Sequence, residues 1–278
     1  MVTEESIEAF HEAVKKYSEY DLSVYSEKSF RRRIEKLLSD RNTTMASITQ
    51  KVIEDPDFME IIIQEITVNT TELFRDPKVW QTLRYRILKK LKYKSEINIW
   101  HAGSSTGQEV YSMLILLNEM NLLHKANLYA SDINQKAIDK AKFGEYAYRF
   151  NIEYIENYKQ VIQQNPYNFE EFKDIPFSKY FDIDKVKDII TAKEIIKNKA
   201  EYRKHDLIKL ENIYNKTFDI VLCRNVLIYF KPEVQNSLFR LFAHSLVPKG
   251  YLILGAHESI LGPEAGLFMK HGYFYLKK

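Results

Sequence analysis

From residue 96 onward, short apolar runs alternate with helical patterns, and this alternation limits the possible folds more than any other feature of the chain. Apolar runs of this length, bounded by turn residues, are typical of buried strands. The helical patterns between them supply the crossovers that parallel strands require. A parallel α/β sheet is therefore predicted. Its strands are residues 97–103, 127–133, 200–207, 217–225 and 250–259, and its helices are 108–120, 134–144 and 232–246.

Two segments depart from this alternation. Residues 267–278 have the pattern of a hairpin around Gly272, so an antiparallel pair is expected and the sheet is predicted to be mixed. Residues 145–200 combine Tyr, Asn and Lys with short apolar pieces and show no strand–helix order. We interpret them as an inserted connection that carries a small subdomain.

The first 94 residues have helical patterns throughout. Apolar side chains recur at helical spacing, as at Phe30, Ile34 and Leu37. A polar connector at 69–77 ends in proline, and a helix is predicted over 78–94. The helix around Phe30 is amphipathic, and its basic face is expected to lie away from the glycine loop described below. That face carries Arg32, Arg33 and Lys36.

Composition and charge exclude several classes of protein. Apolar residues are 45% and charged residues 28% of the 278, a globular balance. Cys223 is the single cysteine, so neither an intrachain disulfide nor a zinc site of paired cysteines is expected, and no metal site is predicted. A formal charge of +3 does not call for nucleic acid. Lacking a secretory signal pattern and any apolar run of about 18 residues, the chain is expected to be cytoplasmic, without membrane insertion.

A glycine-containing loop, Ala102 to Gly107, joins the first predicted strand to a helix. Small residues there let a ligand approach the backbone, and a helix N-terminus offers free N–H groups. Gln108-Glu109 follows the loop in place of the Lys-Ser/Thr of a P-loop, which argues against nucleoside triphosphates. The loop alone is compatible with a nucleoside site at Gly103 and with a simple tight turn.

Two carboxylates near this loop have both a ligand-binding and a structural interpretation. Asp132 ends the second strand, where an acid can accept hydrogen bonds from both ribose hydroxyls of a nucleoside. It can also be the N-cap of helix 134–144, although we favour ribose binding. Glu109 either completes a capping box with Thr106 or meets the positively charged end of a cofactor.

Three further candidates follow the later strands. Asp206 ends the third strand and either accepts the amino group of an adenine or is an ordinary strand-end residue. Asn225 ends the fourth strand, at the edge where ligands of open α/β sheets bind, or it caps helix 232–246. Tyr229 comes one helical turn later and either faces the same cleft or packs in the core. Spacing alone favours the core for Tyr229.

Four ordered segments give the chain a resemblance to a known family. NTTELFRDP (69–77), AGSSTGQEVYS (102–112), YASDIN (129–134) and FDIVLCRNVLIYF (218–230) resemble the chemotaxis receptor methyltransferase (CheR) family. The resemblance covers essentially the whole chain. It implies an all-helical N-terminal domain over 1–68, a linker with a helix over 69–94, and a Rossmann-like, doubly wound methyltransferase domain with a mixed sheet over 95–278, carrying an inserted β-subdomain at about 150–200.

The same resemblance implies the cofactor, the acceptor and the residues that serve them. The methyl donor would be S-adenosylmethionine, converted to S-adenosylhomocysteine, and the acceptor a glutamate side chain of a methyl-accepting chemoreceptor. Arg75 and Tyr229 match positions that orient the reactants at the transferred methyl, while Arg32, Arg33 and Lys36 would approach the acidic receptor helices. The cofactor would be held by Asn69, Thr71, Arg75, Gly103, Glu109, Asp132, Asp206, Leu207 and Asn225.

The chain departs from the family pattern in two places. Gln108 stands where members usually have a second acid beside Glu109. Residues 178–200 lack the glycine-bearing loop associated with members whose β-subdomain holds a C-terminal receptor peptide, so the resemblance does not extend to peptide tethering.

Two other functions stay open. One is a methyltransferase for nucleic acid or a small molecule, although amino-directed enzymes usually carry an Asn/Asp-Pro-Pro-aromatic segment where this chain has Arg224-Asn225-Val226-Leu227. The other is a signalling module that binds S-adenosylmethionine or its product without catalysis. Arg75 and Tyr229 argue against the second function, because a binding module needs neither.

Overall fold

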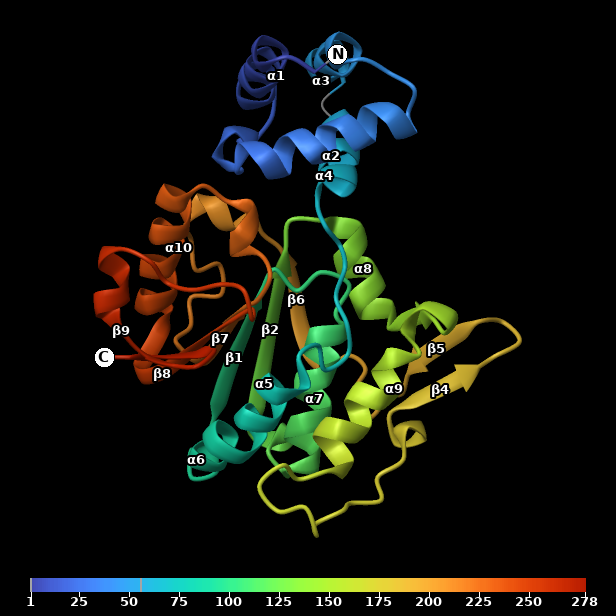
Figure 1. Cartoon of the computed structure of the whole chain (residues 1–278), viewed down its shortest axis with the longest axis vertical. Helices are drawn as coiled ribbons and strands as arrows, with labels where there is room; N and C mark the ends of the chain where they lie inside the picture. Colours follow the sequence, from blue (N-terminus) through green and yellow to red (C-terminus); the bar gives the residue numbers. More distant parts are fainter. Residues whose placement is uncertain (1, 56) are drawn as a thin grey trace.

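The computed structural model describes residues 2–55 and 57–278, except for the side chain of Phe150. Four helices gather at one end of the molecule, above an α/β part (Figure 1). The apolar stripes of these helices pack into one core that includes Phe10, Ile34 and Ile62, which confirms the predicted helical character of this region. The four helices are α1 (Glu4–Tyr17), α2 (Glu27–Asp40), α3 (Met45–Glu54) and α4 (Phe58–Ile66).

A connector of residues 67–76 leads from α4 to the α/β part (Figure 1). It passes into α5 (Pro77–Thr82), whose first residue is a proline, a residue suited to the first turn of a helix. The helix then continues through a π-helical turn at Leu83–Leu88 into α6 (Lys89–Leu91). The segment predicted as one helix over 78–94 is therefore helical but has a wider turn in its middle.

A seven-stranded mixed sheet forms the centre of the α/β part. Its strand order is β6-β2-β1-β7-β8-β10-β9, in which β10 runs antiparallel to both its neighbours and the other pairs are parallel. This arrangement confirms the predicted α/β fold, including the hairpin around Gly272. The strands are β1 (Ile97–Ala102), β2 (Ala126–Asp132), β6 (Ala200–Lys204), β7 (Phe218–Cys223), β8 (Leu246–Leu254), β9 (Phe268–His271) and β10 (Phe274–Lys277).

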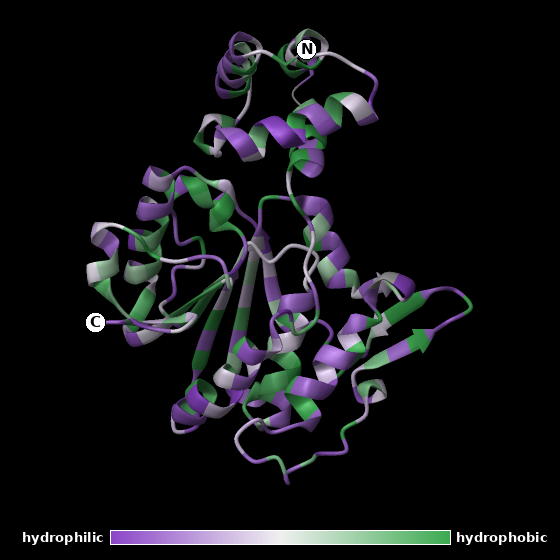
Figure 2. Ribbon diagram, in the orientation of Figure 1, coloured by the Kyte–Doolittle hydropathy of each residue, from purple (hydrophilic) through white to green (hydrophobic). Residues whose placement is uncertain are grey.

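Helices cover both faces of this sheet, and the alternation of side chains along a strand explains how. In β7, Ile220 and Leu222 lie in the core formed with α7 (Gln108–Glu119), whereas Val221 and Cys223 lie in the core formed with α10 (Pro232–Ser245). Every residue of β7 is buried, and all are apolar except Asp219, which pairs with Lys94. Figure 2 shows the same distribution, with apolar residues along the central strands.

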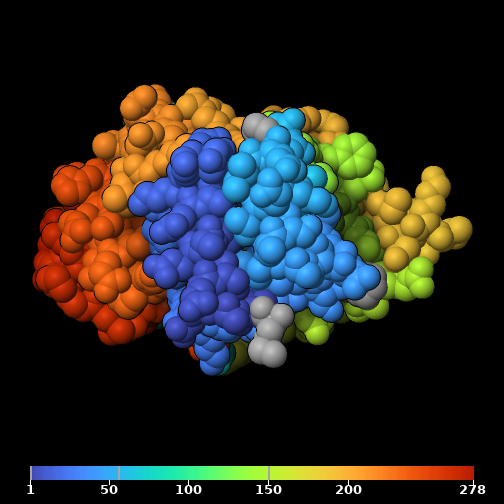
Figure 3. All heavy atoms as spheres, turned by 90° about the horizontal axis from the view of Figure 1, so that it is seen from above, coloured from blue at the N-terminus to red at the C-terminus, as the bar shows by residue number. Residues whose placement is uncertain are grey.

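Strand order reverses between β1 and β7, and this reversal positions the site. The crossover from β1 leads to β2 on one side, while β7 pairs with β1 on the other side with Ile99 opposite Ile220. The loops that leave β1 and β7 therefore separate at their carboxyl ends, where open α/β sheets bind ligands. Figure 3 shows the N-terminal helices lying across this end of the molecule.

The insertion contains a second, antiparallel sheet of order β3-β5-β4. It begins at Glu145, the start of the segment interpreted as an inserted connection, because β5 pairs with the chain that leaves α8 (Gln135–Phe143). Gly144 ends α8 with a positive φ of 71°, and its carbonyl accepts a hydrogen bond from Ala192. The remaining elements are β3 (Glu145–Ala147), α9 (Glu153–Tyr158), β4 (Phe181–Asp184) and β5 (Ile189–Ala192). Within the described residues, no helix has the length and hydropathy needed to cross a bilayer.

Candidate active site

A cavity lies between the N-terminal helices, the connector and the carboxyl edge of the sheet. Its space, counting the open mouth, is about 1080 Å³. The residues predicted from the sequence converge on it from segments that lie far apart along the chain. Those that line it are Arg33, Asn69, Thr71, Arg75, Gly103, Glu109, Asp132, Asp206, Leu207, Asn225 and Tyr229.

The loop after β1 approaches the cavity because two glycines adopt conformations that other residues avoid. Gly103 has a φ of 80°, and a Cβ there would lie 2.5 Å from Val226 Cγ2. Gly107, with a φ of 90°, is the N-cap of α7 and has no side chain that could accept from the first turn. The N–H groups at the start of α7 therefore have no side-chain cap, as expected for a ligand-binding helix N-terminus.

Asp132 braces this loop and is not the helix cap. Its two carboxylate oxygens accept hydrogen bonds from the backbone N–H groups of Ser105 (2.7 Å) and Asn134 (2.9 Å). The N-cap of α8 is Asn134, whose side chain accepts from Ala137, so the capping interpretation of Asp132 is wrong. Burial raises the pKa of Asp132, and the backbone hydrogen bonds partly offset this effect. Each oxygen retains a lone pair for a ligand hydroxyl.

Glu109 does not form a capping box, because Gly107 is the N-cap and Thr106 donates to Gln108 instead. The Glu109 carboxylate instead pairs with His101 Nδ1 at 2.9 Å and with Arg224 Nη1 at 3.1 Å. Burial alone would raise the pKa of Glu109, but the hydrogen bond from His101 and the charge of Arg224 outweigh it, and the pKa is lowered. Glu109 is therefore a largely buried anion in the lining of the cavity.

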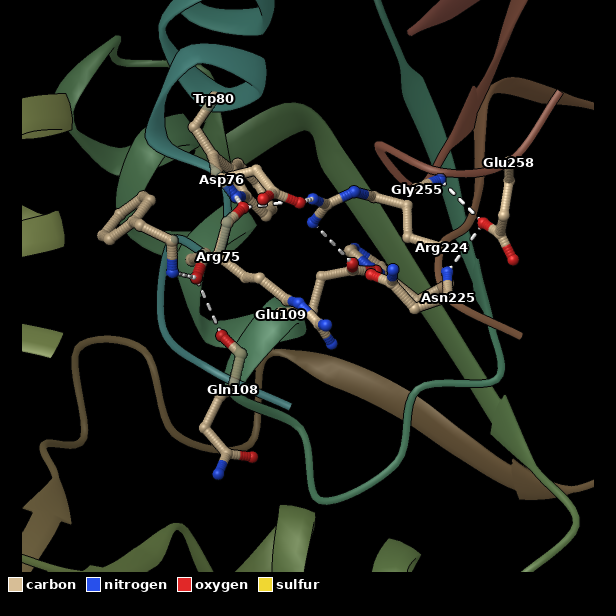
Figure 4. Close-up of polar contacts among 12 residues, drawn as sticks. Arg75, Asp76, Trp80, Gln108, Glu109, Arg224, Asn225, Gly255 and Glu258 are labelled. Atoms are coloured by element: carbon tan, nitrogen blue, oxygen red, sulfur yellow. Dashed lines mark hydrogen bonds and ion pairs between the residues drawn. The ribbon is translucent and has the colours of Figure 1, made fainter. Parts of the chain in front are cut away.

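Arg224 is a buried cation that the sequence interpretation left without a role. Its side chain is 1% exposed, and it contacts both Glu109 and the connector. Nη2 donates to Asp76 Oδ2 at 2.7 Å and to the carbonyl oxygen of Arg75 at 3.1 Å (Figure 4). An arginine that directly follows a fully buried strand was the available signal, because such a charge requires partners.

Arg75 extends into the cavity from a turn with unusual backbone geometry. Phe74 and Asp76, on either side of it, have φ values of 53° and 58°, a region that non-glycine residues rarely occupy. The carbonyl of Arg75 also accepts from Trp80 Nε1 at 3.0 Å. Among the described residues, the Arg75 guanidinium has no hydrogen-bond or ion-pair partner and is available to a ligand.

The loop after β7 is organised by Glu258, a second residue that the sequence interpretation missed. Its carboxylate accepts from the backbone N–H groups of Asn225 and Gly255 at 2.7 Å each (Figure 4). It also accepts from the backbone N–H of Leu227 at 2.8 Å. Asn225, with a φ of 60°, faces the cavity, and the N-cap of α10 is Lys231, so the capping interpretation of Asn225 is wrong.

Tyr229 and Asp206 complete the polar lining. Tyr229 ends a short 3-10 turn (Leu227–Tyr229) and is half-buried at the cavity, so the core interpretation that spacing favoured is wrong. Asp206 accepts from the backbone of Ile208 at 3.2 Å, and burial raises its pKa to about 6. Its neighbour His205 has its pKa lowered to about 4 by burial and is therefore neutral at physiological pH.

The three basic residues predicted for partner binding separate in the structure. Arg33 lines the cavity together with Ser29 and Phe30, which corrects the expectation that the whole basic face lies away from the glycine loop. Arg32 and Lys36 are exposed, and Lys36 pairs with Asp40 one turn later. The helix is amphipathic as predicted, but the orientation of α2 over the cavity turns Arg33 inward.

Comparison with known proteins gives a consistent result. A family model described as CheR methyltransferase, SAM binding domain, matches residues 69–175 and 163–272. A Pseudomonas putida protein with the provisional name methyltransferase Cher3 is 35% identical over 88% of this chain and 85% of its own length. Several relatives are named chemotaxis protein methyltransferase. Among them, one from Listeria innocua is 28% identical over 96% of this chain and 95% of its own length, and one from Borreliella burgdorferi is 30% identical over 72% of this chain and 68% of its own length.

The mixed α/β sheet and the cavity at its switch point agree with this family match, which spans most of the chain. The chain belongs to the CheR family of S-adenosylmethionine-dependent methyltransferases.

Proposed function

We propose that this chain transfers the methyl group of S-adenosylmethionine to glutamate side chains of a methyl-accepting chemoreceptor, in adaptation of chemotaxis. The observation that carries the proposal is the Arg75 guanidinium, which has no partner among the described residues and lies in the cavity that Glu109 and Asp132 also line. A guanidinium presents two parallel N–H donors that match a carboxylate. The names of the Listeria and Borreliella relatives support the chemotaxis context.

The residues of the cavity fit the donor. Asp132 would accept from the ribose hydroxyls, Asp206 and Leu207 would adjoin the adenine, and Glu109 would meet the positively charged methionine end. Asn69 and Thr71 of the connector would close over the donor, and Gly103 and Asn225 would lie against it. When bound, S-adenosylmethionine supplies a methyl group made electrophilic by the sulfonium charge.

The acceptor carboxylate needs orientation rather than deprotonation. A glutamate, with an ordinary pKa of about 4.3, is already ionised at neutral pH. One of its oxygens forms the new C–O bond while the C–S bond breaks and its electron pair stays on sulfur, which yields a methyl ester and S-adenosylhomocysteine. Arg75 would hold the carboxylate in line, and Tyr229 would donate a hydrogen bond beside the methyl group. With the acceptor docked over its mouth, the cavity would limit competing water.

The surroundings of the cavity suggest how a receptor docks. Arg32 and Lys36 are exposed on α2, the helix from which Arg33 reaches the cavity. In the proposed complex they would face acidic receptor helices. We propose no peptide tether at the β3-β5-β4 sheet. If the acceptor is the cytoplasmic part of a receptor, the proposed location of this chain is the cytoplasm. The proposed domain division is residues 1–68, 69–94 and 95–278.

The decisive experiment is incubation with labelled S-adenosylmethionine and cytoplasmic receptor fragments. Base-labile label on glutamate is expected. If no fragment carries such label, the proposal that receptor glutamates accept the methyl group is refuted. Arg75→Ala and Tyr229→Phe should each lower turnover more than they weaken binding of S-adenosylhomocysteine, because they act at the transferred methyl. A protein that binds the cofactor tightly but never turns over would instead be a sensing module.

A further inference from the structure

Arg224 joins two parts of the cavity that the chain connects only through long paths. One arm of its guanidinium meets Glu109, 115 positions away, and the other meets Asp76 and the Arg75 carbonyl, 148 and 149 positions away. Glu109 lies at the start of α7, and residues 75 and 76 belong to the connector. Figure 4 shows the guanidinium lying between these groups.

The connector turn is held by contacts that come from several parts of the chain. Phe74 and Asp76, the non-glycine residues on either side of Arg75, have positive φ values, which cost about 1–3 kcal/mol each and persist only when the surroundings hold them. The Phe74 ring is fully buried and packs against Trp80 and Tyr158. Backbone hydrogen bonds join Phe74 N–H to Ser112 Oγ (2.7 Å) and Val79 N–H to the Asp76 carbonyl (2.8 Å). The Arg75 carbonyl accepts from the Trp80 indole, and Arg224 donates to both the Arg75 carbonyl and Asp76. Among these, the contacts of Arg224 link the turn directly to Glu109.

Glu109 in turn is held on both sides, by His101 at one oxygen and Arg224 at the other. His101 is fully buried, so the carboxylate has little freedom to move away from Arg224. A displacement of Glu109 would therefore be carried through the guanidinium to the backbone of Arg75.

We propose that Arg224 is a positioning residue that fixes Arg75 relative to Glu109, so that the site for the donor and the site for the acceptor carboxylate form one rigid unit. Arg224 touches no reacting atom and acts through the backbone of Arg75. The inference rests on the proposed function for the role of Arg75 at the acceptor.

A double-mutant cycle tests whether Arg224 acts through Arg75. R224K keeps the charge but cannot donate in two planar directions, and it should lower kcat roughly tenfold while the KM for S-adenosylmethionine changes much less. In an R75A background the same change should lower kcat less than about twofold, because the residue through which it acts is gone. Equal fold losses in both backgrounds would overturn the proposal.

A second readout does not depend on activity. Amide hydrogen exchange of residues 73–79 should be faster in R224K, because the turn loses an anchor. Unchanged exchange there overturns the proposal even where no acceptor is methylated. Faster exchange in R224K, together with a wild-type protein that methylates no receptor glutamate, would support the positioning role and count against the proposed function alone.

Two further variants serve as a substitute for R224K and as its control. Should R224K fail to fold, D76A carries the same cycle, because it removes the side-chain acceptor of Arg224 Nη2, the Asp76 side chain is 36% exposed, and the change leaves Glu109 paired with Arg224. R240K is the matched control, since Arg240 pairs with a buried carboxylate, Glu264, outside the cavity lining. Wild-type kcat is expected for R240K.

Discussion

At the scale of single residues, the position of Gly103 in the cavity lining has no space for a side chain. Gly103→Ala combines a positive φ with a Cβ placed 2.5 Å from Val226 Cγ2, so we expect a loss of about 1–3 kcal/mol in the free energy of unfolding and weaker S-adenosylhomocysteine binding. Denaturant unfolding and calorimetry measure the two effects. Adding Val226→Ala should restore only part of the stability, because the backbone strain remains.

Gly266→Ala provides the control for this prediction. Its φ is not in the left-handed region, and a Cβ there would have no neighbour within 4 Å. Stability close to that of the wild type is expected for Gly266→Ala. If Gly103→Ala were equally stable, the loop would be free to move away from Val226, and the proposed close approach of the donor to the backbone would lose its basis.

Asp206 predicts a pH dependence of stability. Its pKa is about 6 in the folded protein because of burial, against about 3.9 in an unfolded chain, so ionisation is harder when the chain is folded. Its contribution to stability is thus fully present below about pH 4 and is lost as pH rises through about 6. Asn at position 206 cannot ionise. As pH rises from about 4 to above 6, the free energy of unfolding of Asp206→Asn should therefore increase by on the order of 2 kcal/mol relative to that of the wild type.

Denaturant unfolding between pH 4 and 7 measures this difference. His205, with a pKa lowered to about 4 by burial, changes stability in the opposite direction, since its neutral form is favoured by folding and stability falls as pH drops. Because both proteins contain His205, the difference between them isolates Asp206. Parallel stability curves for the two proteins would show that the Asp206 carboxylate is not destabilised by its burial.

At the scale of elements, a short strand-like contact ties the N-terminal helices to the loop after β7. Ser26 N–H donates to the carbonyl of Tyr229 at 2.8 Å, and Lys231 N–H donates to Val24 at 3.0 Å. Tyr25 and Phe230 pair between them, with ring centroids 5.1 Å apart. The position of Tyr229 at the cavity therefore depends on a segment that precedes it by about 200 residues.

Ser26→Pro removes one hydrogen bond of this contact with little other change. Ser26 has a φ of −62°, which suits proline, and its side chain makes no capping hydrogen bond. We expect kcat to fall roughly two- to tenfold, the effect of one lost neutral hydrogen bond on the placement of Tyr229. Glu27→Pro, at the first position of α2, is the control and should keep wild-type kcat. Equal turnover in the two variants would mean that Tyr229 does not need this support.

At the scale of the whole molecule, the N-terminal helices have two faces with different predicted roles. Charge reversal at Arg32 and Lys36, which are exposed, should slow receptor methylation and leave cofactor affinity unchanged. Increasing ionic strength should slow wild-type methylation and affect the variant less. Methylation rates measured across a salt series, with calorimetry of S-adenosylhomocysteine binding, test both statements.

Reversal of Lys270 and Lys278 makes the same change in net charge at the other end of the chain. That variant should methylate receptor at the wild-type rate. A similar loss in both variants would assign the effect to net charge rather than to α2. Arg33→Ala is expected to differ from either, with altered cofactor affinity, because Arg33 lines the cavity.

Periodicity and turn chemistry in the sequence were enough to predict the strands of the central sheet, its closing hairpin and the N-terminal helices. These properties belong to short segments, so a local pattern carries them. The glycine loop and the residues at strand ends were also predictable, because parallel strands bring their carboxyl ends to one edge. The positions of Asp132, Asp206 and Asn225 at the cavity agree with that rule, while their roles toward the donor stay predictions.

Tertiary structure decided what each of these side chains contacts. Glu109 has the spacing of a capping residue, yet it pairs with Arg224, because a buried arginine that follows β7 needs an anionic partner and the N-cap of α7 is Gly107. Arg33 is part of a basic helix face by its spacing, but only the packing of α2 across the sheet edge places it in the cavity. Contacts between residues more than 100 positions apart depend on how elements dock, and no local pattern records that docking.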